Sequence, residues 1–526
     1  MTNRIYMIVL SILNVLTSFL LILQVYLFRN IIDNAVNHIS LKQDIIYIAL
    51  LLLIMIGLRI AYFFIKNKFS LSLEVNLKGQ IYKSIMNKKY ESIASIHSGK
   101  ISNIYLTDIR NVQEAKVNAI PNMFLYTSRI IFAFAALVNL NYVIVLILSS
   151  VGLFLFVLAL IYGYFVKRLN KEALKSDDSL NAYMQESLDN IKLLKVLSKP
   201  SIINDNVDKE LKKNYKVKNK RNKVSIIASS FLSSMITILY ALTLCYAAYL
   251  IYEGKISYGT LTALVSLVSY FESPFSYLAK TLNQLYQSKV SQERIANLVA
   301  LKDDEEEESI TDFDSIIFDS MTFRYDERII YKDFSYKINK GDIIYIKGDS
   351  GKGKTTLINI LLGFYSYEGK VYVTNKDKQY DISEKTRSLF AYVPQENVLF
   401  SGTIRSNFKM FYPSISDEDI IKFLNEVKVY EELKEQGGLE YNIYQRGKGL
   451  SIGQIQRILI AIALASLKPI LVMDEFTSAL DVHNEEAIAT LVCSLNKTLI
   501  MVTHRNIKIE GARILDVSSL SSKGEA

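Results

Sequence analysis

Apolar runs of about 20 residues, the length that crosses a bilayer core as a helix, recur through the first half of the chain. They occupy residues 5–28, 45–65, 121–140, 142–166, 226–252 and 258–278. The pattern therefore predicts six transmembrane helices. The first run is too long for the apolar core of a secretory signal and no small-residue cleavage site follows it, so we expect it to remain as a helix.

Two long polar segments separate the second span from the third and the fourth from the fifth. Both mix apolar and charged residues at helical spacing and contain almost no Gly or Pro, which predicts helices that continue beyond the membrane. Lys and Arg concentrate in them, as in KVKNKRNK at 216–223. Because positive charge accumulates on cytoplasmic loops, both segments and both chain termini are predicted inside the cell.

Composition adds two exclusions. The 526 residues are 50% apolar and carry a formal net charge of +9, but the basic runs flank membrane spans and lack interleaved aromatic residues that could stack on bases. We therefore expect no nucleic-acid partner. The two cysteines, Cys245 and Cys493, suggest neither a disulfide framework nor a metal cluster, so a reducing compartment is the plain interpretation.

The pattern changes after the sixth span. The acidic run KDDEEEES at 302–309 is typical of a solvated linker, and from residue 312 onward strand-like runs alternate with helical ones. We expect three parts: a membrane domain at 1–302 with two long cytoplasmic helical loops, a linker at 303–311, and an α/β domain at 312–526. Within the last part we expect a mixed sheet covered by helices.

A glycine-rich loop follows the apolar strand at 343–346 and precedes an apolar helix. This is a phosphate-binding loop in its required context, which makes the soluble domain a P-loop NTPase. Its glycines let backbone N–H groups surround a phosphate, Lys354 reaches the terminal phosphates, and the Thr355 hydroxyl can hold Mg²⁺. The nucleotide-binding residues expected here are Gly348, Asp349, Ser350, Gly351, Lys352, Gly353, Lys354, Thr355 and Thr356.

A second apolar strand, in PILVMDEF at 469–476, ends in two carboxylates. Ligands of this fold class gather at such strand ends. We expect Asp474 to hold Mg²⁺ through water and Glu475 to polarise the water that attacks the γ-phosphate of ATP.

With these residues the soluble domain resembles the nucleotide-binding domain of ATP-binding cassette (ABC) transporters, and the six spans with two long loops resemble an exporter-type half-transporter. The most specific element is LSIGQ at 450–454, which stands at the family signature and is followed by the usual QR. The resemblance implies that two chains close head to tail over two ATP molecules. Ser451, Gly453 and Gln454 of one chain would then face the nucleotide bound by the other.

Four further positions match the family pattern. The resemblance implies that Tyr325 stacks on adenine, that Gln395 contacts Mg²⁺ and senses the membrane domain, and that His504 contacts the γ-phosphate. Asp481, in SALD at 478–481, would lie in the loop that crosses the dimer interface. The implied catalytic residues are Glu475, His504, Gln395 and Lys354, and the implied metal-binding residues are Thr355, Gln395 and Asp474.

The chain also departs from the family pattern. Ile452 replaces the first glycine of the usual signature, although Ser451 and Gly453 are kept. Asn442 and Gln445 stand where many exporters carry acidic residues that contact the membrane helices. The chain begins almost at its first span, which leaves no room for a peptidase domain, so we expect no processing of its own substrate.

The resemblance implies an ATP-driven exporter of the bacterial cytoplasmic membrane, moving a peptide or a hydrophobic compound. The partner would be a second copy of the chain or a related half-transporter, surrounded by lipid. Two alternatives stay open: a lipid flippase or multidrug pump, and an ATP-binding sensor subunit that transports nothing. The loop tips at 89–98 and 187–198 are candidate coupling helices, while Arg59, Arg129 and Glu272, well inside apolar spans, form either a structural ion pair or a cargo contact.

Overall fold

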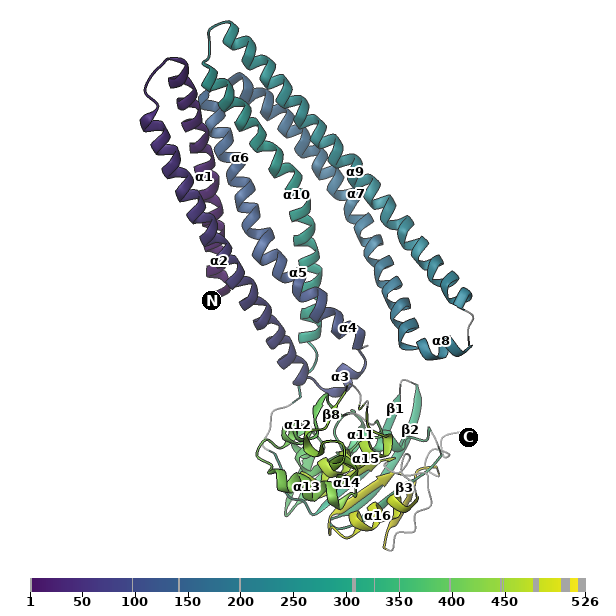
Figure 1. The fold of residues 1–526 in the computed structure, drawn as a ribbon. Helices are drawn as coiled ribbons and strands as arrows, with labels where there is room; N and C mark the ends of the chain where they lie inside the picture. The colour runs from purple at the N-terminus through teal and green to yellow at the C-terminus, as the bar shows by residue number, and fades with distance from the viewer. Residues whose placement is uncertain are drawn as a thin grey trace. The chain divides into compact units, whose positions relative to one another are not determined.

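The structure, a computed structural model, is shown in Figure 1. It describes residues 2–518 apart from 97, 141, 198–199, 305–308, 326, 350, 397–398, 445–446, 448, 476–481 and 503–510. Contacts divide the chain into a helical unit, Met1–Ser84 with Ser98–Ala300, and an α/β unit, Ile85–His97 with Leu301–Ala526. The short segment Ile85–His97 thus belongs with the second half of the chain although helices of the first unit flank it in sequence.

Among the described residues, six long helices build the helical unit, and each predicted span lies inside one of them. They are α1 (Thr2–Val36), α2 (Lys42–Met86), α6 (Ile120–Leu140), α7 (Tyr142–Asp189), α9 (Pro200–Tyr252) and α10 (Tyr258–Val299). The shorter elements are α4 (Ser98–Asn103), α5 (Ile109–Glu114), α8 (Ile191–Leu197) and two π-helical segments, η1 (Ile104–Asp108) and η2 (Ala115–Ala119). Within the described residues, four helices are long and apolar enough to cross a membrane: Asn3–Val36, Lys42–Met86, Gly99–Leu140 and Asn204–Tyr252.

The long helices extend well past the thickness of a bilayer. Helices α2, α7, α9 and α10 contain 45, 48, 53 and 42 residues. A rise of about 1.5 Å per residue makes each of them about twice as long as a hydrocarbon core of about 30 Å. The predicted helical extensions are therefore present.

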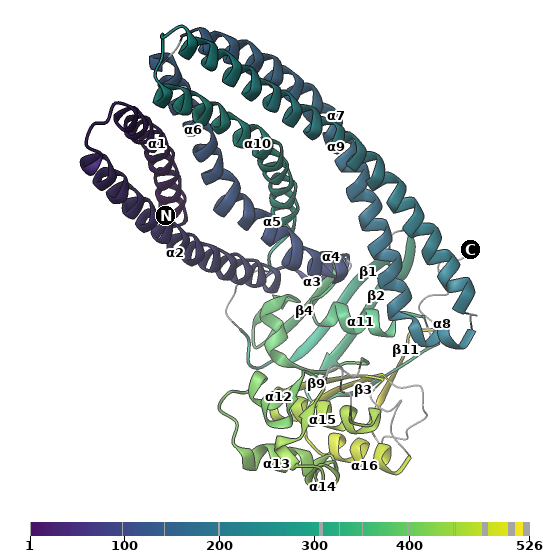
Figure 2. The same cartoon turned by 45° about the horizontal axis from the view of Figure 1, so that its top comes forward.

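Packing in the helical unit centres on three helices. Helices α1, α6 and α10 pack on one another, whereas α7 and α9 form a long antiparallel pair that meets the rest mainly through α10 (Figures 1 and 2). The shared core contains small and branched side chains, among them Ala133, Leu137, Ala263 and Leu264. Small residues at such positions let helix backbones approach closely, which is how membrane helices gain packing energy.

The strands of the α/β unit fall into separate sheets, so the expectation of one mixed sheet was too simple. The antiparallel sheet has the order β2-β1-β4-β5, the parallel sheet has the order β11-β3-β10-β9-β6, and β7 pairs with β8. The bounds are β1 (Ser315–Tyr325), β2 (Arg328–Asn339), β3 (Ile343–Lys347), β4 (Glu368–Asn375), β5 (Lys378–Asp381), β6 (Phe390–Val393), β7 (Gly402–Thr403), β8 (Asn442–Ile443), β9 (Ile470–Asp474), β10 (Thr498–Val502) and β11 (Arg513–Asp516). Tight turns join β1 to β2 and β4 to β5, which forces antiparallel pairing, whereas longer crossovers give the parallel sheet.

The described helices of the α/β unit are α3 (Tyr90–Ala94), α11 (Lys354–Leu361), α12 (Ile404–Phe411), α13 (Asp417–Glu426), α14 (Tyr430–Lys434), α15 (Ile452–Ala465), α16 (Val482–Cys493) and the 3₁₀ turns η3 (Glu384–Leu389) and η4 (Gly438–Glu440). Of the α-helices, α11 and α15 contact strands of the parallel sheet, and α11 to α16 contribute buried side chains to the hydrophobic cores of this unit. Every residue of β9 and β10 is buried. A parallel strand covered on both faces reads as a continuous apolar run, which is why these strands were visible in the sequence.

Candidate functional site

The phosphate loop connects β3 to α11, as the sequence predicts. Gly353 is the N-cap of α11 and has a φ of 95°, a left-handed conformation that favours glycine. A Cβ atom there would lie 2.5 Å from Cγ2 of Ile330, and one at Gly348 would lie 2.7 Å from Cγ2 of Val517. Both glycines are therefore required for the loop to follow its path, and nothing within 4 Å would meet a Cβ at Gly351.

Lys354 folds over this loop. Its Nζ donates to the carbonyl oxygen of Gly348 at 2.7 Å and to that of Asp349 at 3.1 Å, and the side chain is buried. The Tyr331 hydroxyl donates to the Gly353 carbonyl at 2.9 Å and fixes the other end of the loop. The ammonium thus stands at the start of a helix, where the helix dipole and backbone N–H groups favour a phosphate.

Asp474 ends the buried strand β9 and is itself 0% exposed. Within the described residues, neither of its carboxylate oxygens has a hydrogen-bond partner. Burial is the largest influence and raises the pKa of this carboxyl; the nearby Thr355 hydroxyl lowers the pKa, the Glu475 carboxylate raises it and the Lys354 ammonium lowers it, which leaves the pKa above its ordinary value. A buried carboxylate without a partner fits a cation ligand, so Asp474, with the Thr355 hydroxyl, suits Mg²⁺.

Glu475 adopts a left-handed backbone conformation, with a φ of 49°. Its N–H donates to the carbonyl of Val502 at 2.9 Å, and Oε2 accepts from Nε2 of Gln395 at 2.6 Å. Its carbonyl accepts from Nε2 of Gln456 at 3.3 Å. The structure therefore brings together Gln395 and Glu475, which were both predicted to belong to the nucleotide site.

Gln456 was noted in the sequence only as part of the QR that follows the signature, and no role at the site was predicted for it. Its side chain is 0% exposed, lies on α15 two residues after the signature, and supports the backbone of Glu475. The available signal was a polar residue on the apolar, inward face of the helix.

The signature residues begin α15. Ser451 is the N-cap: its hydroxyl accepts from the N–H of Gln454 at 3.2 Å, while Oε1 of Gln454 accepts from the N–H of Ser451 at 2.9 Å. Nε2 of Gln454 also donates to Glu432, which pairs with the buried Arg457 at 2.7 Å. The Ile452 side chain is 59% exposed, so it replaces glycine without disturbing the core.

Tyr325 ends β1 with a ring that is 44% exposed. Phe323 meets it edge-on with ring centroids 4.9 Å apart, and Tyr365 does so at 5.8 Å. Its hydroxyl lies 3.5 Å from Oγ1 of Thr356, on the helix that follows the phosphate loop. The ring is thus held beside the loop, where stacking on a base is sterically feasible.

Several predicted positions lie outside the described residues: Ser350, Asp481, His504 and Gln445. Asn442 is described; it lies in β8 and is paired with Thr403. Of the candidate coupling segments, the tip at 89–98 contains α3 and the tip at 187–198 contains α8.

Three charged residues were predicted inside the spans, and the structure describes the side chains of two of them. The Arg59 guanidinium lies 5.9 Å from the centroid of the Phe63 ring. The Arg129 guanidinium lies 5.9 Å from the centroid of the Tyr270 ring. The side chain of Glu272 lies outside the described ones, so an ion pair or a cargo contact stays a prediction.

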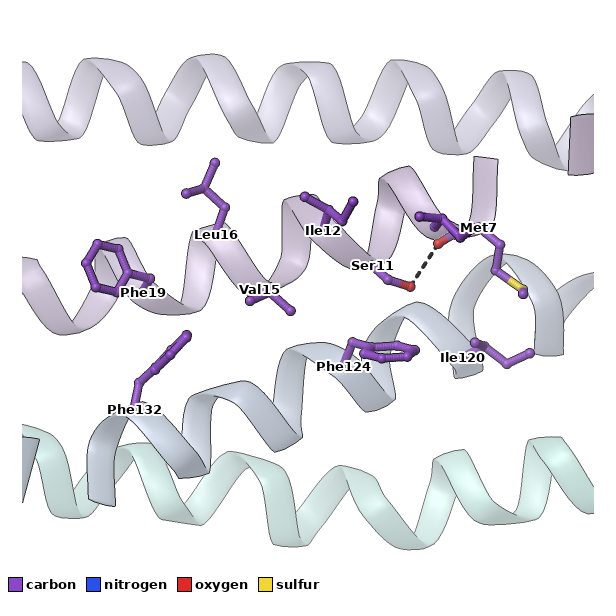
Figure 3. A pocket seen from close by; sticks show the side chains of 10 residues that line it. Met7, Ser11, Ile12, Val15, Leu16, Phe19, Ile120, Phe124 and Phe132 are labelled. Atoms are coloured by element: carbon purple, nitrogen blue, oxygen red, sulfur yellow. Dashed lines mark hydrogen bonds between the residues drawn. The ribbon is translucent and has the colours of Figure 1, made fainter. Parts of the chain in front are cut away.

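An apolar groove of ≈ 650 Å³ runs between α1 and α6 (Figure 3). Ile12, Leu16 and Phe19 of α1 and Phe124 and Phe132 of α6 line it. The hydroxyl of Ser11, also in the lining, donates to the carbonyl of Met7 on its own helix, so the groove offers no free donor there. Such a surface suits the interior of a membrane.

The comparisons with known proteins agree with this geometry. The family profile described as ABC transporter transmembrane region matches residues 7–275, and the one described as ABC transporter matches residues 331–478. The chain therefore belongs to the ABC transporter family, and it combines the membrane region and the ATP-binding region in one polypeptide. The predicted fold class, six-helix membrane part plus P-loop NTPase, is confirmed.

Relatives over nearly the whole length carry export-related names. An export ATP-binding/permease protein of Rickettsia felis is 30% identical over 98% of this chain and 92% of its own length. A lactococcin transport/processing ATP-binding protein (LcnC-like) of Lactococcus lactis is 26% identical over 92% of this chain and 69% of its own length. A solved Atm1-family ABC exporter with ATP bound, only 17% identical, superposes with a TM-score of 0.79 over 98% of this chain and 94% of that chain, which shows the exporter fold.

Proposed function

We propose that this chain is one half of a dimeric, ATP-driven exporter in a bacterial cytoplasmic membrane, with the α/β unit and both termini in the cytoplasm. The observation that carries the proposal is the hydrogen bond from Gln395 to Glu475 beside the unpartnered carboxylate of Asp474. A binding module that never hydrolyses ATP has no chemical use for a positioned acidic residue next to a cation ligand.

The residues divide the work of hydrolysis as follows. Lys354 and the loop N–H groups bind the phosphates, while Thr355 and Asp474 would hold Mg²⁺, which neutralises charge on the phosphates when bound. Glu475 orients the water whose oxygen attacks the γ-phosphorus. The bond from that phosphorus to the oxygen of the departing ADP breaks, and the proton of the water passes to Glu475 or to a phosphate oxygen.

The signature would act in the other site of the dimer. Ser451 and Gly453 lie at the exposed start of α15, where a helix N-terminus favours the γ-phosphate held by the partner chain's loop. Asp481 and His504 keep the roles that the family pattern implies. Under this arrangement neither chain forms a complete site alone, and ATP draws two chains together.

For the cargo we propose a peptide or a hydrophobic compound. The name of the Lactococcus lactis relative refers to lactococcin transport, which favours a peptide cargo. The apolar groove between α1 and α6 agrees with a hydrophobic environment but does not distinguish a peptide exporter from a lipid flippase or multidrug pump.

The test is steady-state ATP turnover by purified full-length protein in liposomes, with candidate peptides, labelled lipids and hydrophobic dyes added in turn. An exporter hydrolyses ATP continuously, and its cargo raises the rate and accumulates on the far side of the membrane. ATP binding without turnover would refute the exporter in favour of the sensor subunit. If only a lipid or only a dye stimulated ATP turnover, the cargo would be of that class and the peptide assignment would be wrong.

A further inference from the structure

Helix α3 is anchored on the α/β unit from both sides. The buried Lys88, just before it, donates from Nζ to the Leu301 carbonyl at 2.8 Å and pairs with Asp303 at 2.6 Å. Within α3, Oε2 of Glu91 accepts from the Ser366 hydroxyl at 2.8 Å and from the Ser366 N–H at 3.3 Å. The segment between α2 and α4 is thus fastened to the nucleotide-binding part of the chain.

Aromatic rings continue from α3 toward the candidate adenine site. The Tyr90 ring on α3 lies 4.7 Å from the Phe364 ring and 6.4 Å from the Tyr365 ring, measured between centroids. Tyr365 also lies 5.7 Å from Phe323 and 5.8 Å from Tyr325, which it meets at 82°. Tyr365 therefore contacts both α3, through Tyr90, and Tyr325, the ring expected to stack on adenine.

The neighbouring Phe364 is held differently. The Arg387 guanidinium lies 5.0 Å from its ring centroid, and that arginine donates to the Gly363 carbonyl at 2.9 Å and pairs with Asp304 at 2.8 Å. These contacts hold the Phe364 ring in place against the Tyr90 ring. They leave Tyr365 as the ring that joins Tyr90 to Tyr325.

We propose that Tyr365 is a positioning residue that links nucleotide binding at Tyr325 to the docking of α3. The proposal rests on the proposed function, because it takes Tyr325 as the adenine-binding ring. When a base covers one face of Tyr325, that ring loses freedom to turn, and its edge contact with Tyr365 becomes better defined. The contact of Tyr365 with Tyr90 then favours one position of α3, from which the chain continues into α4.

Because ATP binding and the docking of α3 are thermodynamically linked, a change at α3 can be measured as a change in ATP affinity. If ATP favours a docked α3, then contacts that dock α3 must favour ATP by the same factor. An aromatic pair contributes about 0.5–1.5 kcal/mol beyond its burial, which corresponds to an about 2- to 12-fold change in affinity. Tyr90 makes its described ring contacts with Phe364 and Tyr365, so it should influence ATP affinity through Tyr365.

The experiment is a double-mutant cycle on the full chain in lipid nanodiscs. Equilibrium binding of a fluorescent ATP analogue is measured in EDTA, where hydrolysis does not proceed, for Tyr90→Leu, Tyr365→Leu and the double variant. We expect Tyr90→Leu to weaken binding about 2- to 12-fold in the parent and to have almost no further effect when Tyr365 is already Leu. Tyr365→Phe, which keeps the ring, should preserve the effect of Tyr90→Leu.

The matched control is Phe411→Leu, because Phe411 and Phe400 form an exposed ring pair elsewhere in the same unit, with centroids 6.3 Å apart. That variant should leave the affinity unchanged, and melting curves of all variants verify folding. An unchanged affinity of Tyr90→Leu, or an equal loss in both backgrounds, would overturn the relay. Tyr325→Leu separates the two levels: if it also leaves affinity unchanged, the adenine assignment fails with the relay, and if it weakens binding alone, only the relay fails.

Discussion

Asp474 is both the expected Mg²⁺ ligand and a destabilising group in the nucleotide-free protein. The carboxyl is 0% exposed and has no hydrogen-bond partner among the described residues. Replacing it by Asn removes the charge while keeping the shape. Because burial disfavours a charged carboxylate more than a neutral amide, even with Lys354 nearby, Asp474→Asn should stabilise the α/β unit by about 1–3 kcal/mol without Mg²⁺ and ATP.

The pH dependence follows from the direction of the pKa shift. Burial raises the pKa of Asp474 in the folded protein, so on a rising pH the unfolded chain releases this proton first. The parent therefore loses stability relative to Asp474→Asn above the ordinary carboxyl pKa of about 3.9, until the pH passes the raised folded value. The difference between the two proteins should be small at acidic pH and largest at neutral and alkaline pH.

The assay is thermal unfolding of both proteins in EDTA and in Mg²⁺ with ATP. A gain of about 1–3 kcal/mol in a unit of this size raises the melting temperature by about 2–12 °C in EDTA. With Mg²⁺ and ATP the order should reverse, because the parent gains binding energy that the variant has lost. The control Asp377→Asn changes an exposed carboxylate, and it should shift the melting temperature by less than about 1 °C. A lower melting temperature for Asp474→Asn in EDTA at pH 8 would refute the reasoning, since it would mean that the carboxylate is paired in the folded protein.

Three further predictions concern ATP hydrolysis, nucleotide trapping in mixed dimers and stimulation of the ATPase by cargo. Glu475→Gln should keep ATP binding and lower hydrolysis about 10²- to 10⁴-fold, measured as phosphate release; turnover at the parent rate would show that another group orients the water. Mixing a Lys354→Ala chain with a Ser451→Arg chain should rebuild one composite site, detected as trapped nucleotide in purified heterodimers, and trapping no greater than in either parent would contradict the head-to-tail arrangement. Glu272→Gln should change cargo-stimulated ATPase far more than basal ATPase, whereas equal loss of both with poor expression would indicate a structural ion pair.

The elements that the sequence predicted are those set by local periodicity. Long apolar runs gave the helices that contain the spans, and buried parallel strands gave the two apolar runs that end at Lys347 and Asp474. The phosphate loop was predictable because its chemistry depends on consecutive residues. Gly348 and Gly353 confirm why the pattern needs glycine, since a Cβ at either position would collide with a neighbouring side chain.

Long-range placement was not predictable in the same way. The family resemblance made 89–98 a candidate coupling helix, but the local pattern of Tyr90 or Lys88 does not identify the partners of this stretch, which lie more than 200 positions away. The division of strands between two sheets likewise depends on which edges pair, and one residue pattern fits several pairings. Gln456 shows the same limit: its helical position was evident, but its partner, the Glu475 carbonyl, lies on another element.

The signature stretch at 450–454 has contacts within its own chain as well as an expected role toward the partner chain. The family pattern assigns Ser451 and Gly453 a role toward the partner chain, which a single chain cannot display. Within its own chain the same stretch caps α15 through Ser451 and Gln454 and supports Glu475 through Gln456. All three contacts belong to the first turns of α15, so we expect a displacement of Ser451 to be passed along this helix to the backbone of Glu475. In the proposed dimer, the nucleotide held by one chain would thus bear on the catalytic carboxylate of the other, which gives a physical reason for polar residues at both glutamine positions.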